Sequence, residues 1–174
     1  MKAKEVYAIL LLLSFLLTSC GMRDSIETDP YEGRALSIGV IGDPLKVRES
    51  GVSMKKIDFS DLNNTDLSSK YDAVFVMENN LSKAADAEYA SIYKSSDIPF
   101  FFIQSTKSYV PFIEEDLSYE DAPDFDGLAY AMGVLYTKDI TWSFGLYNDK
   151  KNEKNIEDIY SRIFKTISEI TVSE

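Results

Sequence analysis

The chain has 174 residues, no histidine and one cysteine, Cys20. The lack of histidine excludes Ser-His-Asp and Cys-His catalytic groups and the common zinc sites, and a lone cysteine excludes an internal disulfide. With 18 basic and 29 acidic side chains the formal charge is −11, which repels the phosphates of nucleic acids. We therefore expect no nucleic-acid partner, and any catalysis would depend on carboxylates, Ser-Lys or tyrosine arrangements, or cations bound by oxygen.

The first residues have the pattern of an export signal. Two lysines precede an apolar run from Val6 to Leu17, which is shorter than the ~20 residues that a stable spanning helix needs. A charged start, an apolar centre and a small-residue end are typical of a secretory signal peptide, with an uncleaved membrane anchor as the alternative. The end of the run, Leu17-Thr18-Ser19-Cys20, resembles the lipobox of bacterial lipoproteins. The resemblance is confined to these twenty residues and implies cleavage before Cys20 and a diacylglyceryl group on its sulfur.

The remaining chain divides into a short polar segment and one domain. We expect residues 1–19 to be the signal peptide, 20–34 a flexible tether containing Pro30 and Gly33, and 35–174 a single α/β domain. Removal of the signal changes the formal charge from −11 to −12. Two acyl chains would hold such a domain at a membrane without any spanning helix.

Strands and helices alternate along the domain. The predicted strands are 35–41, 52–59, 73–77, 98–103 and 140–147. The third and fourth of these are continuously apolar, which is typical of strands buried on both faces of a parallel sheet. Amphipathic spacing predicts helices at 83–95 and 153–170, with Asn152 as a cap of the second. A short helical turn is expected at 45–49, and 127–136 predicts a helix, with a strand as the competing interpretation.

This alternation predicts an α/β fold, in the form of a single three-layer sandwich. We expect a mainly parallel sheet of about five strands, similar in architecture to flavodoxin-like or Rossmann-like sheets. The ten residues between the first two strands are barely enough for a parallel crossover, so an antiparallel first pair is the alternative. The stretch Gly39–Pro44 matches neither GxGxxG nor a P-loop, and we expect no cofactor.

Ligands of open α/β sheets bind beyond the carboxyl ends of the strands. Polar side chains that follow the predicted strands are therefore the candidates for binding a ligand or partner, namely Asp43, Glu78, Asn79, Gln104 and Asn148. The segment 105–126 exceeds twenty residues without a clear period, and we expect it to cover this site. The alternative is that these are ordinary polar loops, and that the acidic half of the segment, 114–126, is solvated and idle.

Other candidate sites are weaker. The acidic residues around Asp124 do not fit the register of an EF-hand loop, so no metal site is predicted. Tyr130, Tyr136, Trp142 and Tyr147 can stack on sugars, although aromatic side chains in strands and helices more often belong to the core.

These observations favour a membrane-anchored extracytoplasmic lipoprotein on the outer side of a bacterial cytoplasmic membrane. We expect a non-enzymatic binding or accessory protein, held by lipid on Cys20, that binds a small polar ligand or an envelope protein. The alternative is a carboxylate-dependent hydrolase of glycans or peptides, with or without Ca²⁺. We do not expect a two-lobed transport protein, because the 155 residues that follow the signal supply one lobe.

Overall fold

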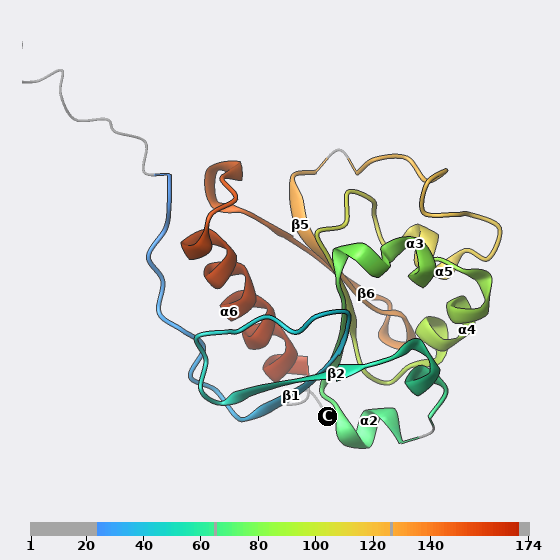
Figure 1. Ribbon diagram of the computed structural model, residues 1–174, viewed down its shortest axis with the longest axis horizontal. Coiled ribbons are helices and arrows are strands. Elements are labelled where there is room, and N and C mark those ends of the chain that lie inside the picture. Colours follow the sequence, from blue (N-terminus) through green and yellow to red (C-terminus); the bar gives the residue numbers. More distant parts are fainter. Residues whose placement is uncertain (1–23, 65, 126, 171–174) are drawn as a thin grey trace, which may run out of the picture.

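The computed structural model describes residues 24–64, 66–125 and 127–170, which form an α/β domain (Figure 1). The strands are β1 (Leu36–Ile41), β2 (Val52–Ile57), β3 (Ala73–Val76), β4 (Phe100–Ile103), β5 (Ala129–Leu135) and β6 (Ile140–Gly145). The α-helices are α2 (Leu67–Lys70), α3 (Leu81–Ala84), α4 (Ala87–Ser95), α5 (Val110–Ile113) and α6 (Glu153–Ile170). Short 3-10 helices are η1 (Phe59–Asn63), η2 (Glu78–Asn80), η3 (Tyr136–Lys138) and η4 (Tyr147–Asp149).

The described strands form one mixed sheet in the order β2-β1-β3-β4-β5-β6. β1 pairs in parallel with β2 and β3, and β3 pairs in parallel with β4. β5 is antiparallel to both of its neighbours, β4 and β6. The prediction of a mainly parallel sheet of about five strands, flavodoxin-like or Rossmann-like, is therefore wrong. The fold remains α/β, but with six strands and an antiparallel C-terminal half.

The extra strand is β5, in the segment whose spacing predicts a helix. Six of its seven residues are buried, because neighbouring strands flank it and both faces of the sheet are covered. A strand buried on both faces loses the alternation that would identify it, and its apolar positions then fit a helical spacing equally well. β5 and β6 form a hairpin through η3, with Asp139 in the left-handed conformation at φ 54°.

Helices cover both faces of the sheet (Figure 1). α3, α4 and α5 contribute to the hydrophobic cluster on one face, and α6 contributes most of the helical residues of the cluster on the other. Phe101 in β4 and Ile163 in α6 are both fully buried, which confirms their prediction as core residues. The predicted span of the last helix, 153–170, is confirmed by α6.

Two other local predictions need correction. The expected helix 83–95 is divided into α3 and α4 at Ala85 and Asp86, where Asp86 has extended backbone angles. The crossover from β1 to β2 contains no helical turn at 45–49, because these residues form an irregular loop. The crossover is nevertheless parallel, so the antiparallel alternative is excluded.

The N-terminal segment, residues 24–34, runs alongside α6 (Figure 1). Asn155 in α6 accepts a hydrogen bond from the Ile26 N–H, and Arg48 donates to the hydroxyl of Thr28. These contacts give the described part of the expected tether a defined path along the domain. Among the described residues, no helix combines the length and apolar character needed to cross a bilayer.

Candidate ligand-binding site

The carboxyl ends of β1, β3 and β4 meet at one edge of the sheet, which we call the carboxyl edge. α6 and β5 begin at this edge, and a pocket of about 710 Å³ lies between them and the strand ends. We call it the edge pocket, and its described lining residues are Leu45, Lys46, Val47, Arg48, Glu49, Met77, Glu78, Gln104, Tyr130, Lys151, Asn152, Glu153, Ile156, Glu157 and Tyr160. Its volume lies within the range of about 300–1,000 Å³ found for small-molecule sites.

Four of the five candidate residues come together at this edge. Asp43, Glu78, Asn79 and Gln104 line a second hollow of about 440 Å³, and Glu78 and Gln104 also line the edge pocket. Asp43 is strongly exposed and pairs with Lys56, with 2.7 Å between Oδ1 and Nζ. The hydrogen bond and charge of Lys56 lower the pKa of Asp43, as expected for an exposed ion pair. Glu78 and Gln104, rather than Asp43, therefore define the centre of the site.

Asn148 and the expected cover do not take part. Asn148 is exposed in η4, beyond the end of β6, and lines neither hollow. In the segment 105–126, Phe112 stacks on Phe102 and belongs to the cluster beneath α3 and α4. None of the described residues of this segment lines either hollow. The described part of this segment therefore does not lie over either hollow, because burial of its apolar side chains holds it against the helices.

Gln104 has two unusual features where it follows β4. Its backbone is left-handed, with φ 62°, a conformation that costs a non-glycine residue of order 1–3 kcal/mol. Its backbone N–H donates to the carbonyl oxygen of Tyr130, which ties it to β5. The side-chain oxygen Oε1 is buried and has no hydrogen-bond partner among the described residues. A buried acceptor without a partner is uncommon in folded proteins, and Gln104 is one of the residues that line the edge pocket.

Two tyrosines form the aromatic wall of the pocket. Tyr160 projects from α6 and Tyr130 from β5, and both are buried. Burial, with the neighbouring hydroxyl of Tyr130, raises the pKa of Tyr160 far above its ordinary value. Burial and the negative charge of Glu78 also raise the pKa of Tyr130. Both phenols therefore remain neutral at physiological pH, where they can donate or accept hydrogen bonds.

The raised pKa of Tyr160 predicts a stability loss at high pH. Above the ordinary pKa of about 10, the unfolded chain releases a proton that the folded protein retains, so unfolding becomes more favourable. Tyr160→Phe removes the ionisable hydroxyl. Between pH 9 and pH 11, the unfolding free energy of the variant should therefore fall by about 1 kcal/mol less than that of the wild type. Urea denaturation at both pH values measures this difference. Tyr136→Phe, at a side chain 43% exposed, is the control and should behave as the wild type.

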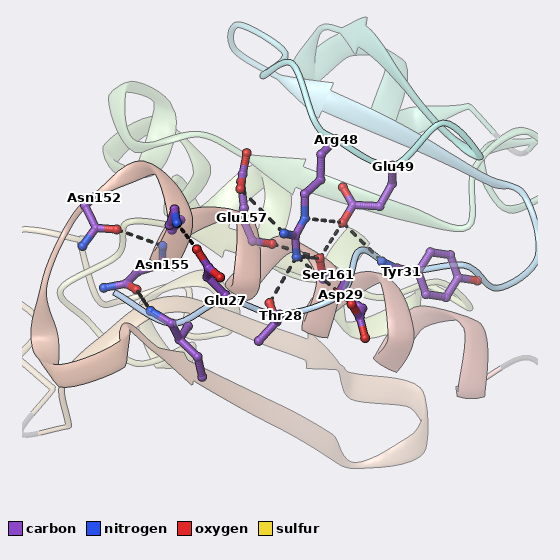
Figure 2. A network of polar contacts seen from close by, with 12 residues as sticks. Glu27, Thr28, Asp29, Tyr31, Arg48, Glu49, Asn152, Asn155, Glu157 and Ser161 are labelled. Carbon is purple, nitrogen blue, oxygen red and sulfur yellow. Dashed lines mark hydrogen bonds and ion pairs between the residues drawn. The ribbon is translucent and has the colours of Figure 1, made fainter. Parts of the chain in front are cut away.

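Arg48 and Glu49 also line the pocket, where a network of polar contacts joins them to α6 and the N-terminal segment (Figure 2). Nη2 of Arg48 donates to Ser161 Oγ at 2.8 Å, and Nη1 lies 3.6 Å from a carboxylate oxygen of Glu157. Glu49 is buried, and its Oε1 accepts hydrogen bonds from Ser161 Oγ and the backbone N–H of Tyr31. Its other oxygen, Oε2, is buried without a hydrogen-bond partner among the described residues. Glu49 is thus a second lining residue, after Gln104, that holds a buried acceptor without a partner.

The N-terminus of α6 does not need an anionic ligand to balance its helix dipole. The side-chain oxygen Oδ1 of Asn152 accepts from the Asn155 N–H at 3.1 Å, and Glu153 places a carboxylate in the first turn. Both groups already complement the positive end of the helix dipole. The described residues contain no group of three or more acidic or cysteine side chains placed to hold a metal ion. Four buried polar atoms of the lining residues have no hydrogen-bond partner among the described residues: the acceptors Gln104 Oε1 and Glu49 Oε2, the donor Arg48 Nε and the hydroxyl of Tyr160. The two acceptors among them are suited to an organic hydrogen-bond donor.

Sequence reasoning identifies the strand-end residues of this site but misses its walls. The apolar stripe of α6 includes Tyr160. The stripe correctly predicts that the ring is buried, but it does not indicate any role for the hydroxyl. The pattern around Tyr130 indicates only a residue that stacks on sugars or packs in the core. Arg48 and Glu49 lie in a loop without periodicity, and only their contacts with the N-terminal segment and α6 distinguish them. No local sequence signal reports contacts of that kind.

Comparison of the chain with protein-family models, with curated proteins and with solved structures found no match.

Proposed function

We propose that this protein is a lipoprotein, anchored through Cys20 outside the bacterial cytoplasmic membrane, whose domain binds a small organic cation in the edge pocket. It acts as a binding or accessory protein rather than as an enzyme. The anchoring rests on the lysines of the first residues, the short apolar run and Leu17-Thr18-Ser19-Cys20. The binding role rests chiefly on one observation: two residues that line a pocket of small-molecule size, Gln104 and Glu49, each hold a buried acceptor oxygen without a hydrogen-bond partner among the described residues.

The chemistry of the lining defines the ligand class. The unpaired acceptors can accept hydrogen bonds from N–H or O–H groups of a ligand. The carboxylate of Glu78 lies close enough to Tyr130 to raise the pKa of that tyrosine. Tyr130 and Tyr160 line the same pocket, and aromatic rings attract ammonium groups. Met77 and Ile156 supply apolar surface for a carbon skeleton. The net charge of −11 further favours cations over anions at long range.

Thermal unfolding of residues 20–174 with a panel of amines tests this proposal. Putrescine, choline and glucosamine are the probes, with acetate and succinate as anionic controls of similar size. A ligand that binds only the folded state adds about 2.7 kcal/mol of stability at a hundred times its dissociation constant. We expect at least one amine to raise the melting temperature in a concentration-dependent way, and neither anion to do so.

A pair of glutamate variants assigns the effect to the pocket. Glu78→Gln removes one charge but little volume, and should weaken amine binding at least about tenfold, because hydrogen bonds to charged groups contribute about 1.5–3 kcal/mol. Glu115→Gln removes the same charge from an exposed position outside the pocket and should bind as the wild type. Equal affinities of the two variants, or stabilisation by the anions alone, would contradict the site. Turnover of a glycan or peptide by the purified domain would contradict the non-enzymatic role.

A further inference from the structure

The N-terminal segment leaves the domain at the carboxyl edge of the sheet. The backbone oxygen of Asp24 accepts hydrogen bonds from the side-chain amides of Asn152 and Asn155, at 2.8 and 3.0 Å. Asn152 lines the edge pocket, and Asp24 shares a further hollow with Tyr147, just beyond the end of β6. Figure 1 shows the segment starting at the end of the domain where α6 and β5 begin.

The length of chain before Asp24 limits how far this edge can lie from a lipid on Cys20. Four peptide units join the two residues, and four extended residues span at most about 14 Å. The strand β5 alone, from Ala129 to Leu135, is about 20 Å long at the usual rise per residue. The opposite edge of the sheet is therefore farther from Asp24 than this stretch of peptide can extend, whereas the carboxyl edge lies beside Asp24.

Exposed apolar side chains are concentrated at the same edge. Of the four large apolar side chains that are exposed among the described residues, Leu45, Phe125 and Leu128 lie at the carboxyl edge. Leu128 is 71% exposed, and its backbone oxygen approaches Gly145 at the end of β6. The N–H of Phe125 donates to the carbonyl of Thr106, just after β4. The fourth, Tyr136, follows the end of β5 at the opposite edge.

We infer that the carboxyl edge is the membrane-facing surface of the domain, with Leu128 and Phe125 in contact with the bilayer and the edge pocket on the membrane side. The inference rests on the anchoring proposed above, because a lipid on Cys20 supplies the short link. Burial of two large apolar side chains in the acyl boundary gives a favourable free energy roughly proportional to the area removed from water. The anchor and the exposed side chains then act on the same surface, and the domain has a defined orientation.

Tryptophan quenching by brominated lipid tests this orientation, because the chain has a single tryptophan, Trp142, which is replaced by phenylalanine. Leu128→Trp and Tyr136→Trp then place one exposed probe at each edge of the sheet. Each variant is expressed at full length, purified with its native processing and reconstituted in phosphatidylcholine vesicles that carry brominated chains. Flotation of the vesicles first reports whether the protein is anchored, independently of its orientation. We expect loss of most of the Leu128→Trp emission and little loss from Tyr136→Trp.

The outcomes separate the orientation from the anchoring. If the protein floats with the vesicles but both probes are quenched equally, or neither is quenched, the carboxyl edge does not face the bilayer and the inference is overturned. If the protein floats, neither probe is quenched and chemical cross-linking shows a dimer, the exposed apolar residues contact a second copy of the chain instead of the bilayer. The same two variants expressed as residues 21–174, which carry neither the apolar run nor Cys20, should neither float nor be quenched. Failure of the parent protein to float would contradict the anchoring itself.

Discussion

Phe101→Ala should lower the free energy of unfolding by about 3–5 kcal/mol. Phe101 is fully buried in the centre of the sheet, where its ring lies within 6.1 Å of the rings of Phe75, Trp142 and Phe144. Phe101 pairs with Gly133 of β5. A Cβ at position 133 would lie 2.6 Å from the ring of Phe101, so the ring fills the space that a side chain there would occupy. Truncation leaves a cavity between β3, β5 and β6 that rigid strands cannot close. The loss is comparable to the whole stability of a domain, about 5–15 kcal/mol.

Urea denaturation of the two proteins measures this loss, with Phe125→Ala as the matched control. Phe125 is 38% exposed and follows the irregular segment after β4, so its truncation should cost less than about 1 kcal/mol. A cost below about 1 kcal/mol for Phe101→Ala would show that the core is not centred on β4.

Asn155→Ala should have the second largest effect, about 2–4 kcal/mol, because each buried polar group left without a partner costs about 1–3 kcal/mol. Asn155 is fully buried, and its side-chain nitrogen donates to the carbonyls of Asp24, Tyr147 and Lys150. Its side-chain oxygen accepts from the N–H of Ile26. One amide, on the first turn of α6, therefore contacts both the N-terminal segment and η4.

Two measurements check this role. Urea denaturation gives the global loss, and limited proteolysis within residues 24–34 reports release of the N-terminal segment, which should be cleaved faster in the variant. Asn64→Ala is the control, because Asn64 is exposed and its amide makes one long hydrogen bond, 3.4 Å, to Asp61. If Asn155→Ala resembled Asn64→Ala in both measurements, the segment would be held by other contacts.

The sequence predicts the strands and helices whose periodicity is unambiguous. β3 and β4 are short apolar runs between polar ends, and α6 carries a continuous apolar stripe, so each is recognisable alone. β5 is not, because a strand buried on both faces and a buried helix have the same composition over seven residues. A helix predicted at the position of β5 therefore gives the wrong number and the wrong direction of strands in the C-terminal half of the sheet.

The candidate site is predictable only where it follows from topology. Glu78 and Gln104 can be placed because residues that follow parallel strands meet at one edge. Asn148 lines neither hollow, because η4 turns the chain beyond β6, with Asn148 itself at φ 48°. The contacts of Glu49 and Asn155 join residues more than a hundred positions apart, and local pattern does not encode such pairs.

Native mass spectrometry of the protein, isolated in mild detergent from its own membrane, tests the proposed function most directly. We predict the mass of residues 20–174 with a diacylglyceryl group on Cys20, together with a bound small molecule that dissociates on collisional activation. The bound molecule should be retained by Glu115→Gln and lost from Glu78→Gln. A protein that keeps residues 1–19 and carries no lipid, or a lipidated protein without a bound small molecule, would contradict the proposal.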